Sequence, residues 1–286
     1  MLTRQKLILD LLRQASRPVS KLELMKWAFV LARESATGKG EMFYEFLPYH
    51  YGPFSFGLQR DLDMFATTGL LFESDKNWNW NPANEPLNLP VPLSNDANNI
   101  LNRFRQWSSN EVIDYVYRTY PSYTVNSKRE RLAPRPVAAP AVYTSGYEGL
   151  QIDGFLDRLV QAGIRRLIDV RNNPVARRYG FHKSTLQRLC GYLEIDYTHV
   201  PELGIVSAER QRLDTAEDYN RLLDRYESRT LSQQAGATVQ VAKLMRETPS
   251  VLVCMEAEAI RCHRSRLAEA VARSTGLEIV HLGVQT

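Results

Sequence analysis

Hydrophobic positions follow two different spacings in this chain, and the change comes near residue 140. Before that point apolar residues recur three and four positions apart, as Leu7, Ile8, Leu11 and Leu12 do, which is the spacing of an amphipathic helix. After it, short apolar runs alternate with helical segments, and this alternation predicts a parallel sheet with crossover helices. The expected fold class is α/β with a mostly parallel sheet and flanking helices, preceded by a mainly helical, winged-helix-like domain.

The first part of the chain contains several helix signals and one hairpin. Ser20 with Glu23, and Ser108 with Glu111, have the spacing of the capping boxes that start helices. The predicted helices cover residues 3–14, 20–32 and 55–68, a hairpin follows at 70–80, and two more helices open at Ser94 and Ser108. Three helices followed by a hairpin are typical of a winged helix, so we expect residues 1–125 to form such a domain.

A charged, proline-containing stretch separates the two patterns. Residues 126–140 hold three prolines and four positive charges, with little that could pack in a core. We expect this stretch to be a linker and residues 141–286 to form the α/β domain. The predicted strands lie at 141–145, 166–170, 196–200, 251–255 and 278–282. The predicted helices lie near 151–162, 183–193, 216–230, 236–247 and 262–274.

The amino-acid composition of the chain is typical of a globular protein. The chain is 44% hydrophobic and 24% charged, and no apolar run approaches the roughly 18 residues of a membrane helix. The N-terminus lacks the apolar core of a signal peptide, and three cysteines do not make a disulfide framework. We therefore expect a cytoplasmic protein that contacts no membrane. The net charge of +4 is a mild sign of a polyanionic partner, and binding nucleic acid would require local clustering of basic residues.

Polar side chains follow the predicted strands at their carboxyl ends, where open α/β sheets bind ligands. Asp169 and Arg171 leave one strand on the same face, because side chains two residues apart point the same way. One interpretation makes Arg171 an anion clamp and Asp169 a base or its orienting partner. The alternative is a partly exposed ion pair that orients a loop.

The segment 251–265 gathers the most chemistry. An apolar strand ends at Cys254 and Glu256, and after a short loop a helix opens with Cys262 and His263. We predict that Glu256 is the general acid or base, since a partly buried carboxylate is suited to exchanging protons near neutral pH. Cys262 is a candidate nucleophile with His263 beside it, because neighbouring cations and a helix start favour the thiolate; a packed core thiol is the alternative.

Zinc is a further alternative for this segment, with Cys254, Cys262 and His263 as ligands. Adjacent Cys262 and His263 are poor ligand geometry, and the usual two-residue cysteine spacing is missing. We therefore expect no metal. We expect no cofactor either, because the chain contains no Walker loop, no Gly-x-Gly-x-x-Gly and no Gly-x-Ser-x-Gly.

Two further groups of residues are candidates for binding. The predicted substrate contacts of the second domain lie at strand ends and at a helix start, and they offer charged, amide, phenol or imidazole groups. They are Arg171, Arg264, Tyr147, Asn172 and His199. The predicted nucleic-acid contacts of the first domain are Lys21, Lys26, Arg60 and Trp78. Trp78 has a second interpretation, as part of the core, and solvated helix faces are the commoner explanation for scattered lysines.

Residues from about 141 to 283 resemble the bacterial domain-of-unknown-function family 488. The motifs that carry the likeness are Tyr143–Tyr147, Leu167–Pro174, Tyr197–Gly204, Cys254-Met255-Glu256 and Cys262-His263-Arg264. The family's motif positions fall on residues selected above, namely Asp169, Arg171, Glu256, Cys262, His263 and Arg264. By association, the resemblance implies a bacterial setting such as phage defence or DNA modification.

Two other likenesses are present. The first domain resembles the Panacea domain of bacterial antitoxins, through Lys26–Leu31, Tyr51-Gly52-Pro53, Gly69-Leu70-Leu71 and Val112–Val116, and a winged-helix regulator is an equally good interpretation. Leu167–Arg171 and the pairing of Cys254 with Arg264-Ser265 are similar to rhodanese, although ten residues separate Cys254 from Arg264 here.

These observations lead to three functional hypotheses. The first is a protein that binds nucleic acid, most readily DNA, through its first domain and acts on a nucleotide or nucleic-acid substrate by acid/base chemistry at a glycosidic or phosphoester bond. The second is a rhodanese-like thiol or sulfur-transfer enzyme. The third is a non-enzymatic DNA-binding regulator or antitoxin that senses an anionic ligand. A homodimer and an operon-encoded protein partner are both compatible with the sequence.

Overall fold

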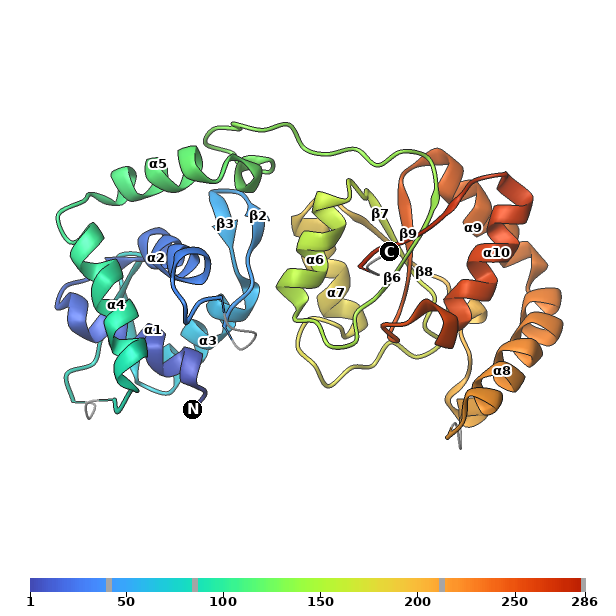
Figure 1. Ribbon diagram of the computed structural model, residues 1–286, viewed down its shortest axis with the longest axis horizontal. Coiled ribbons are helices and arrows are strands. Elements are labelled where there is room, and N and C mark those ends of the chain that lie inside the picture. The colour runs from blue at the N-terminus through green and yellow to red at the C-terminus, as the bar shows by residue number, and fades with distance from the viewer. Residues whose placement is uncertain (40–42, 84–86, 211–213, 284–286) are drawn as a thin grey trace. The chain divides into compact units, whose positions relative to one another are not determined.

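The computed structural model describes residues 1–39, 43–83, 87–210 and 214–283. The chain divides into two compact units, Met1–Pro134 and Arg135–Thr286, and the division falls within the stretch expected to be a linker (Figure 1). Each unit is described by itself below. No helix in the described part of the chain has the length and the apolar composition needed to cross a membrane.

The first unit is rich in helices and contains two small antiparallel sheets. Its strands β1, β5 and β4 form one sheet in the order β1-β5-β4, and β2 pairs with β3 in the other. The elements in chain order are α1 (Thr3–Ala15), β1 (Val19–Ser20), α2 (Lys21–Glu34), β2 (Leu47–Tyr49), β3 (Gly52–Phe54), α3 (Phe56–Thr67), β4 (Leu71–Ser74), β5 (Asn77–Trp80), α4 (Val91–Phe104), α5 (Ser109–Thr119) and the 3-10 turn η1 (Pro121–Thr124).

Helix starts in this unit follow the sequence signals with one exception. Ser108 and Glu111 form the complete capping box at α5, and the Ser20 hydroxyl accepts from the Glu23 N–H at the start of α2. The fourth helix was expected to open at Ser94, and this is wrong, because α4 begins at Val91. A proline in the first helical turn explains the earlier start. The fixed φ of proline suits a helix, and no hydrogen bond is lost there because N–H groups in the first turn have no acceptor within the helix.

The stretch expected to be a linker is bound to the units at both ends. The N–H of Lys128 donates to the His50 carbonyl at 2.8 Å, and Arg129 pairs with Asp114 at 2.7 Å. On the other side of the division, Arg135 donates to the Leu193 carbonyl at 2.7 Å. Each half of the stretch therefore belongs structurally to the unit it adjoins.

The second unit is a five-stranded parallel sheet in the order β10-β6-β9-β7-β8. Figure 1 shows α6 and α7 on one side of this sheet and α9 and α10 on the other. The predicted α/β fold class with flanking helices is confirmed. The main elements are β6 (Val142–Gly146), α6 (Ile152–Gln161), β7 (Arg166–Asp169), α7 (Lys183–Tyr192), β8 (Asp196–His199), α8 (Ala216–Arg225), α9 (Ala235–Glu247), β9 (Ser250–Cys254), α10 (His263–Thr275) and β10 (Ile279–His281).

The second unit also contains short helical elements. They are η2 (Pro201–Leu203), η3 (Ser207–Arg210), the π-helical turn η4 (Tyr226–Leu231), which continues α8, and η5 (Ala259–Arg261).

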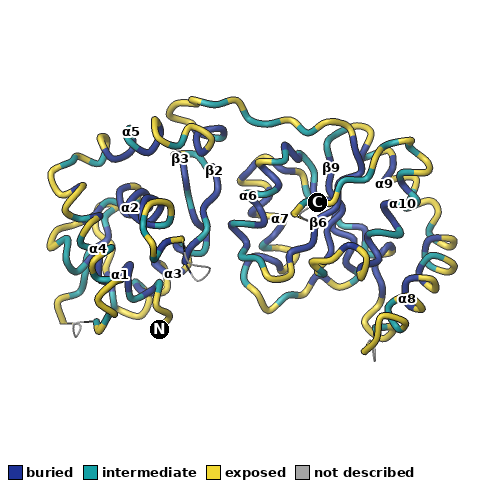
Figure 2. Tube along the Cα trace, in the orientation of Figure 1, coloured by how far each residue is buried: buried dark blue, intermediate teal, exposed yellow. Residues whose placement is uncertain are grey.

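Strand β9 lies at the centre of the sheet and sets the position of the site. All residues of β9 are buried (Figure 2). A strand covered on both faces requires a continuous apolar run, which Val251–Val253 supplies. In the strand register Cys254 pairs with Gly146 of β6, and Val253 pairs with Asp169 of β7. The carboxyl ends of the three central strands therefore meet at one edge.

Candidate functional site

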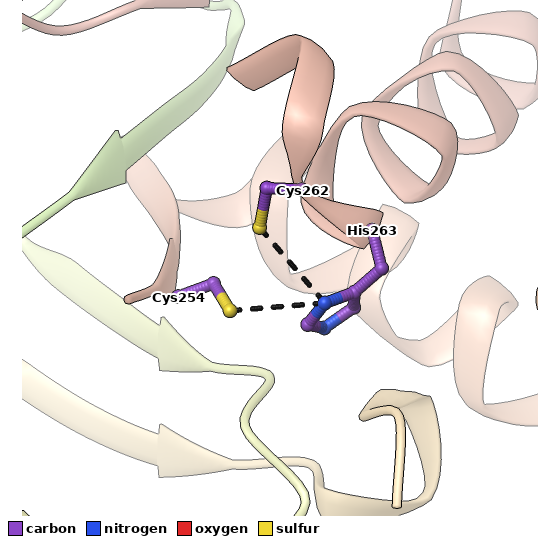
Figure 3. Close-up of side chains that lie close together, drawn as sticks. All are labelled: Cys254, Cys262 and His263. Carbon is purple, nitrogen blue, oxygen red and sulfur yellow. Dashed lines mark hydrogen bonds between the residues drawn. The ribbon is translucent and has the colours of Figure 1, made fainter. Parts of the chain in front are cut away.

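Cys254, Cys262 and His263 converge beyond the end of β9. Cys254 is the last residue of the strand, Cys262 caps α10, and His263 is the first residue of that helix. The imidazole Nδ1 lies 3.7 Å from Sγ of Cys254 and 3.9 Å from Sγ of Cys262 (Figure 3). Their potential ligand atoms all lie within 4.8 Å of one another, and the three residues are buried. One strand end and one helix start thus form a compact cluster.

Glu256 completes this cluster on its more exposed side. Its Oε2 lies 2.9 Å from Sγ of Cys254 and 3.0 Å from Sγ of Cys262. Its Oε1 accepts from Nη1 of Arg210 at 2.6 Å. The side chains of Glu256 and Arg210 are 18% and 30% exposed, so both can reach solvent. The carboxylate therefore lies between buried sulfur atoms and a partly exposed guanidinium group.

The charges within the cluster are strongly coupled. Burial acts to raise the pKa of Cys254, but the hydrogen bond from Cys262 and the charge of His263 outweigh it and hold that pKa well below its ordinary value. Burial, followed by the neighbouring Cys254, raises the pKa of Cys262. Burial acts to lower the pKa of His263, and the negative charge of Cys254 raises it overall. Relative to the isolated side chains, the cluster therefore favours the deprotonated form of Cys254 and the protonated form of His263.

His263 is held from its far side. Its Nε2 lies 3.0 Å from the Val170 carbonyl, which fixes that nitrogen as the donor and leaves Nδ1 directed at the sulfur atoms. The Tyr226 ring packs edge-on against the imidazole with ring centroids 5.2 Å apart, and its hydroxyl donates to the Leu203 carbonyl. The imidazole orientation is therefore set by backbone and packing.

The loop that carries Glu256 is held by contacts with its backbone. A Cβ placed on Gly146 would lie 1.8 Å from the Glu256 carbonyl oxygen, so only glycine permits this approach. Arg264 donates to the Glu256 and Ala257 carbonyls at 2.5 and 2.9 Å, and the Ala257 N–H donates to Glu148 at 3.0 Å. The prediction that Arg264 holds a substrate phosphate is contradicted, because the side chain is 1% exposed and donates to this loop.

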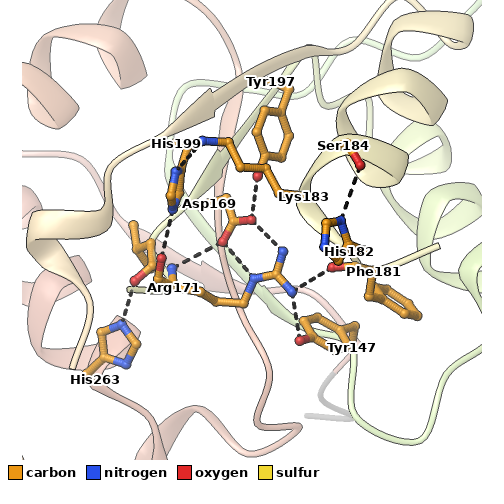
Figure 4. A network of polar contacts seen from close by, with 11 residues as sticks. Tyr147, Asp169, Arg171, Phe181, His182, Lys183, Ser184, Tyr197, His199 and His263 are labelled. Carbon is orange, nitrogen blue, oxygen red and sulfur yellow. Dashed lines mark hydrogen bonds and ion pairs between the residues drawn. The ribbon is translucent and has the colours of Figure 1, made fainter. Parts of the chain in front are cut away.

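Asp169 and Arg171 form a second network, which adjoins the cluster through the contact between His263 and the Val170 carbonyl (Figure 4). Arg171 donates to Asp169 from Nε at 2.8 Å and from Nη2 at 2.5 Å, and its Nη1 donates to the Tyr147 hydroxyl and the Phe181 carbonyl. Asp169 also accepts from the Tyr197 hydroxyl at 2.6 Å, and it is fully buried.

This geometry corrects three predictions. Arg171 is not an anion clamp, because it is 6% exposed and its donors serve protein acceptors. Asp169 is not placed to act as a base, because it is buried and bonded to Arg171 and Tyr197. Tyr147 does not face a ligand, since its ring stacks on Phe181 with centroids 4.2 Å apart and its hydroxyl accepts from Arg171. The ion-pair alternative describes this network, with the pair buried instead of partly exposed.

Asn172 and His199 remain half-buried at the same edge of the sheet. The Asn172 amide donates to the Pro201 carbonyl at 3.2 Å. His199 Nε2 lies 2.9 Å from the Arg171 carbonyl, and Lys183 Nζ lies 2.9 Å from its Nδ1. These contacts tie two loops together, and a substrate contact by either residue stays a prediction.

Two of the predicted nucleic-acid contacts in the first unit are contradicted. Lys26 is 1% exposed and donates to the Pro53 carbonyl at 2.9 Å, and burial lowers its pKa to about 7. Trp78 is also 1% exposed, so its core interpretation holds. Lys21 pairs with Glu73 at 2.7 Å and lies over the Trp78 ring, while Arg60 is exposed on α3.

Sequence reasoning missed Arg210, and it expected the adjacent Cys262 and His263 to have poor geometry as joint ligands. Arg210 lies in η3, inside an aperiodic segment that carries no motif. Cys262 has extended backbone angles, whereas His263 is the first residue of a helix. That change of backbone conformation between neighbours lets both side chains face Cys254.

Fold and site together define a parallel α/β domain with a Cys–Glu–Cys–His cluster at the carboxyl end of its central strand. The family model described as domain of unknown function DUF488 matches residues 151–271, within the second unit. The resemblance of this domain to that family is therefore confirmed, and the matched segment contains the whole cluster. No curated protein and no solved structure matches the chain.

Proposed function

We propose that the second unit is a hydrolase for a nucleotide or nucleic-acid substrate and that Glu256 is its general acid/base. One observation carries this proposal: the Glu256 carboxylate joins the buried Cys254–Cys262–His263 cluster to the partly exposed Arg210. A carboxylate in that position has access to solvent on one side and a low-dielectric surface on the other. Acid/base catalysis requires both, because the group must exchange protons and also act on bound substrate.

Arg210 supplies the contact that selects an anionic substrate. Its guanidinium is 30% exposed and bonded to Glu256 through Nη1 at 2.6 Å. Arginine is suited to bidentate binding of phosphate, so a substrate phosphate can share Arg210 with the carboxylate. Substrate binding would then bring the scissile bond next to Glu256.

The reaction consumes one water molecule. Glu256 accepts a proton from water while the water oxygen attacks the anomeric carbon of a glycosidic bond or the phosphorus of a phosphoester. The bond to the leaving group breaks with its electron pair. Glu256 then returns the proton to the leaving group, which restores the carboxylate.

The first unit is proposed to bring this chemistry to DNA. Its succession α1-β1-α2-α3-β4-β5 and its sheet order β1-β5-β4 support a winged-helix assignment, with the β2–β3 hairpin as an addition. Arg60 is exposed on α3, and Lys76 is exposed at the tip of the β4–β5 hairpin. These are the two elements that a winged helix presents to DNA.

Duplex binding tests this assignment directly. Fluorescence anisotropy at several salt concentrations should give weaker binding and a shallower salt slope for Arg60→Gln with Lys76→Gln, because each lost phosphate contact reduces the slope by about one. Lys243→Gln is the matched control, since Lys243 is an exposed lysine of the second unit. Equal slopes for all three proteins would remove the DNA-binding role of these residues.

Product analysis tests the catalytic proposal. The full chain is incubated separately with DNA, RNA and mononucleotide pools, and the products are identified by mass spectrometry. We expect one pool to give species that differ from substrate by the addition of water across a single bond. Tight operator binding with no product in any pool would overturn the hydrolase and favour a regulator.

A further inference from the structure

We infer that Cys254, Cys262 and His263 hold one divalent transition metal ion of the zinc class, at a position that the Glu256 carboxylate faces. The site is formed by the end of β9 and the start of α10, and its potential ligand atoms lie within 4.8 Å of one another. Thiolate and imidazole are the donors that zinc prefers.

The distances from the imidazole nitrogen to the two sulfur atoms are close to those of a metal-centred arrangement. Zinc bonds of about 2.3 Å to sulfur and about 2.0 Å to nitrogen at tetrahedral angles place S and N roughly 3.6 Å apart. The observed distances from Nδ1 are 3.7 Å to Cys254 and 3.9 Å to Cys262. Small movements of the side chains would therefore bring all three donors to bonding distance of one ion.

A cation also resolves the electrostatics of this cluster. Two sulfur atoms and a carboxylate oxygen meet with separations of 2.9 and 3.0 Å from Oε2, and both cysteines are 1% exposed. Without an ion both thiols can donate to this oxygen, whereas a bound ion would displace the thiol protons and supply the positive charge that buried thiolates need. Arg210 is bonded to Oε1 of Glu256 through Nη1, and its Nη2 lies 3.5 Å from Nδ1 of His263, so this guanidinium would have to turn away from Nδ1 when an ion binds.

The surroundings of His263 are those of a metal ligand. The contact of 3.0 Å between Nε2 and the Val170 carbonyl makes Nε2 the donor, so in the neutral ring Nδ1 carries the lone pair that can coordinate an ion. The Tyr226 ring holds the imidazole in place. Such an outer contact is what orients ligating histidines in metalloproteins.

Three protein ligands leave a fourth position open, as in catalytic zinc sites, whereas structural sites supply four protein ligands. Glu256 borders that position through Oε2. A carboxylate beside a His/Cys/Cys metal is the arrangement in which glutamate takes a proton from the metal-bound water. This role deepens the proposed function and rests on it, but metal binding by the three ligands stands independently of catalysis.

Metal binding is measured on the full chain, first on wild type alone. The metal-free, reduced protein is titrated with Co²⁺, and elemental analysis follows loading with Zn²⁺. We expect roughly one ion per chain and the thiolate-to-cobalt absorption band of a sulfur-ligated site. Absence of bound ion or of that band, or a Cys254–Cys262 disulfide that forms in preference to metal binding, would overturn the inference.

Variants then assign the ligands. Cys254→Ser, Cys262→Ser and His263→Gln should bind Co²⁺ more than about 100-fold more weakly than wild type, since loss of a direct ligand exceeds the effect of an outer contact. Cys190→Ser is the matched control, a buried thiol on α7, and it should bind as wild type does. Equal binding by all four variants would contradict the assignment.

Glu256→Gln separates the two proposals. The inference predicts that this variant keeps the ion, and loss of the ion would make Glu256 a ligand and remove the open position. A loaded wild-type protein that yields no product in any pool would contradict the proposed hydrolase but leave the metal site intact. If metal-free and metal-loaded protein form product at equal rates, the metal has no role in the reaction, but both the hydrolase proposal and the metal site stand.

Discussion

Arg210 and Glu256 are 46 residues apart in the sequence, and their side chains form an ion pair of 2.6 Å at the edge of the buried thiol cluster. The pair gives the Glu256 carboxylate a fixed position and gives the site one partly exposed cation. In the proposed function, Arg210 binds the substrate phosphate and the neighbouring Glu256 transfers the proton.

Removing the cation should weaken substrate binding. Arg210→Gln is expected to lower kcat/KM by about 10- to 100-fold, mainly through KM, because the charge-assisted contact to a substrate phosphate is lost. Arg261→Gln is the control, since Arg261 is an exposed arginine paired with Glu258 outside the cluster. Steady-state kinetics on the substrate found by product analysis measure both, and equal KM values would contradict the role of Arg210.

The buried ion pair of Asp169 should matter for folding. Asp169→Asn is expected to reduce the free energy of unfolding by about 3–5 kcal/mol, because Arg171 would remain buried without its counter-charge. Asp196→Asn breaks the exposed pair with Arg166 and should change it by less than about 1 kcal/mol. Thermal unfolding followed by circular dichroism compares the two. If both variants lose a similar free energy of unfolding, burial does not govern the contribution of Asp169 to stability.

Gly146 should control the position of Glu256. In Gly146→Ala the new methyl group would overlap the Glu256 carbonyl, so the loop must move. We expect turnover to fall about 100-fold, which is the scale of a 1 Å misplacement of a catalytic group. Gly191→Ala is the control, because a Cβ there meets open space. Turnover of Gly146→Ala at the wild-type rate would show that the close approach has no catalytic consequence.

Lys26 should make the stability of the first unit depend on pH. Burial lowers its pKa from 10.5 to about 7, so between these values the unfolded chain binds more protons than the folded one. Stability should therefore rise with pH across that window, by up to about 1.4 kcal/mol per unit from this group. Below the window both states are protonated, and the contribution of Lys26 to the slope disappears.

Tryptophan fluorescence isolates this effect, because Trp27, Trp78, Trp80 and Trp107 all lie in the first unit. Urea unfolding between pH 6 and 10 should show the rise for wild type and a flatter profile for Lys26→Met, which has no titrating group at this position. Parallel profiles for the two proteins would show that Lys26 does not titrate in this range.

The sequence predicted the fold well because its elements follow local periodicity. The strand at β9 is a run of apolar residues bounded by polar ones, and the capping box of Ser108 and Glu111 marks a helix start without reference to the rest of the chain. The cluster of Cys254, Cys262 and His263 was found because its members lie within one strand–helix connection.

Roles that depend on burial could not be predicted in the same way. Arg171 and Arg264 have the side chain of a phosphate ligand, and only the structure shows that both are buried and donate to protein acceptors, Arg264 through Nη1 and Nη2. Lys26 lies in the part of α2 from Glu23 to Leu31, where every residue is buried, and a count of charges does not reveal this. Arg210 was missed because its contact with Glu256 depends on tertiary folding alone.

The most direct test of the proposed acid/base role of Glu256 compares the turnover of Glu256→Gln with that of Glu258→Gln on the identified substrate. Glu258 is two residues away, exposed, and paired with Arg261, so its variant controls for charge and for general effects on the loop. We expect a loss of about 100- to 10,000-fold for Glu256→Gln, the range for removal of an acid/base group, and wild-type turnover for Glu258→Gln. Equal turnover by wild type and both variants would contradict this role.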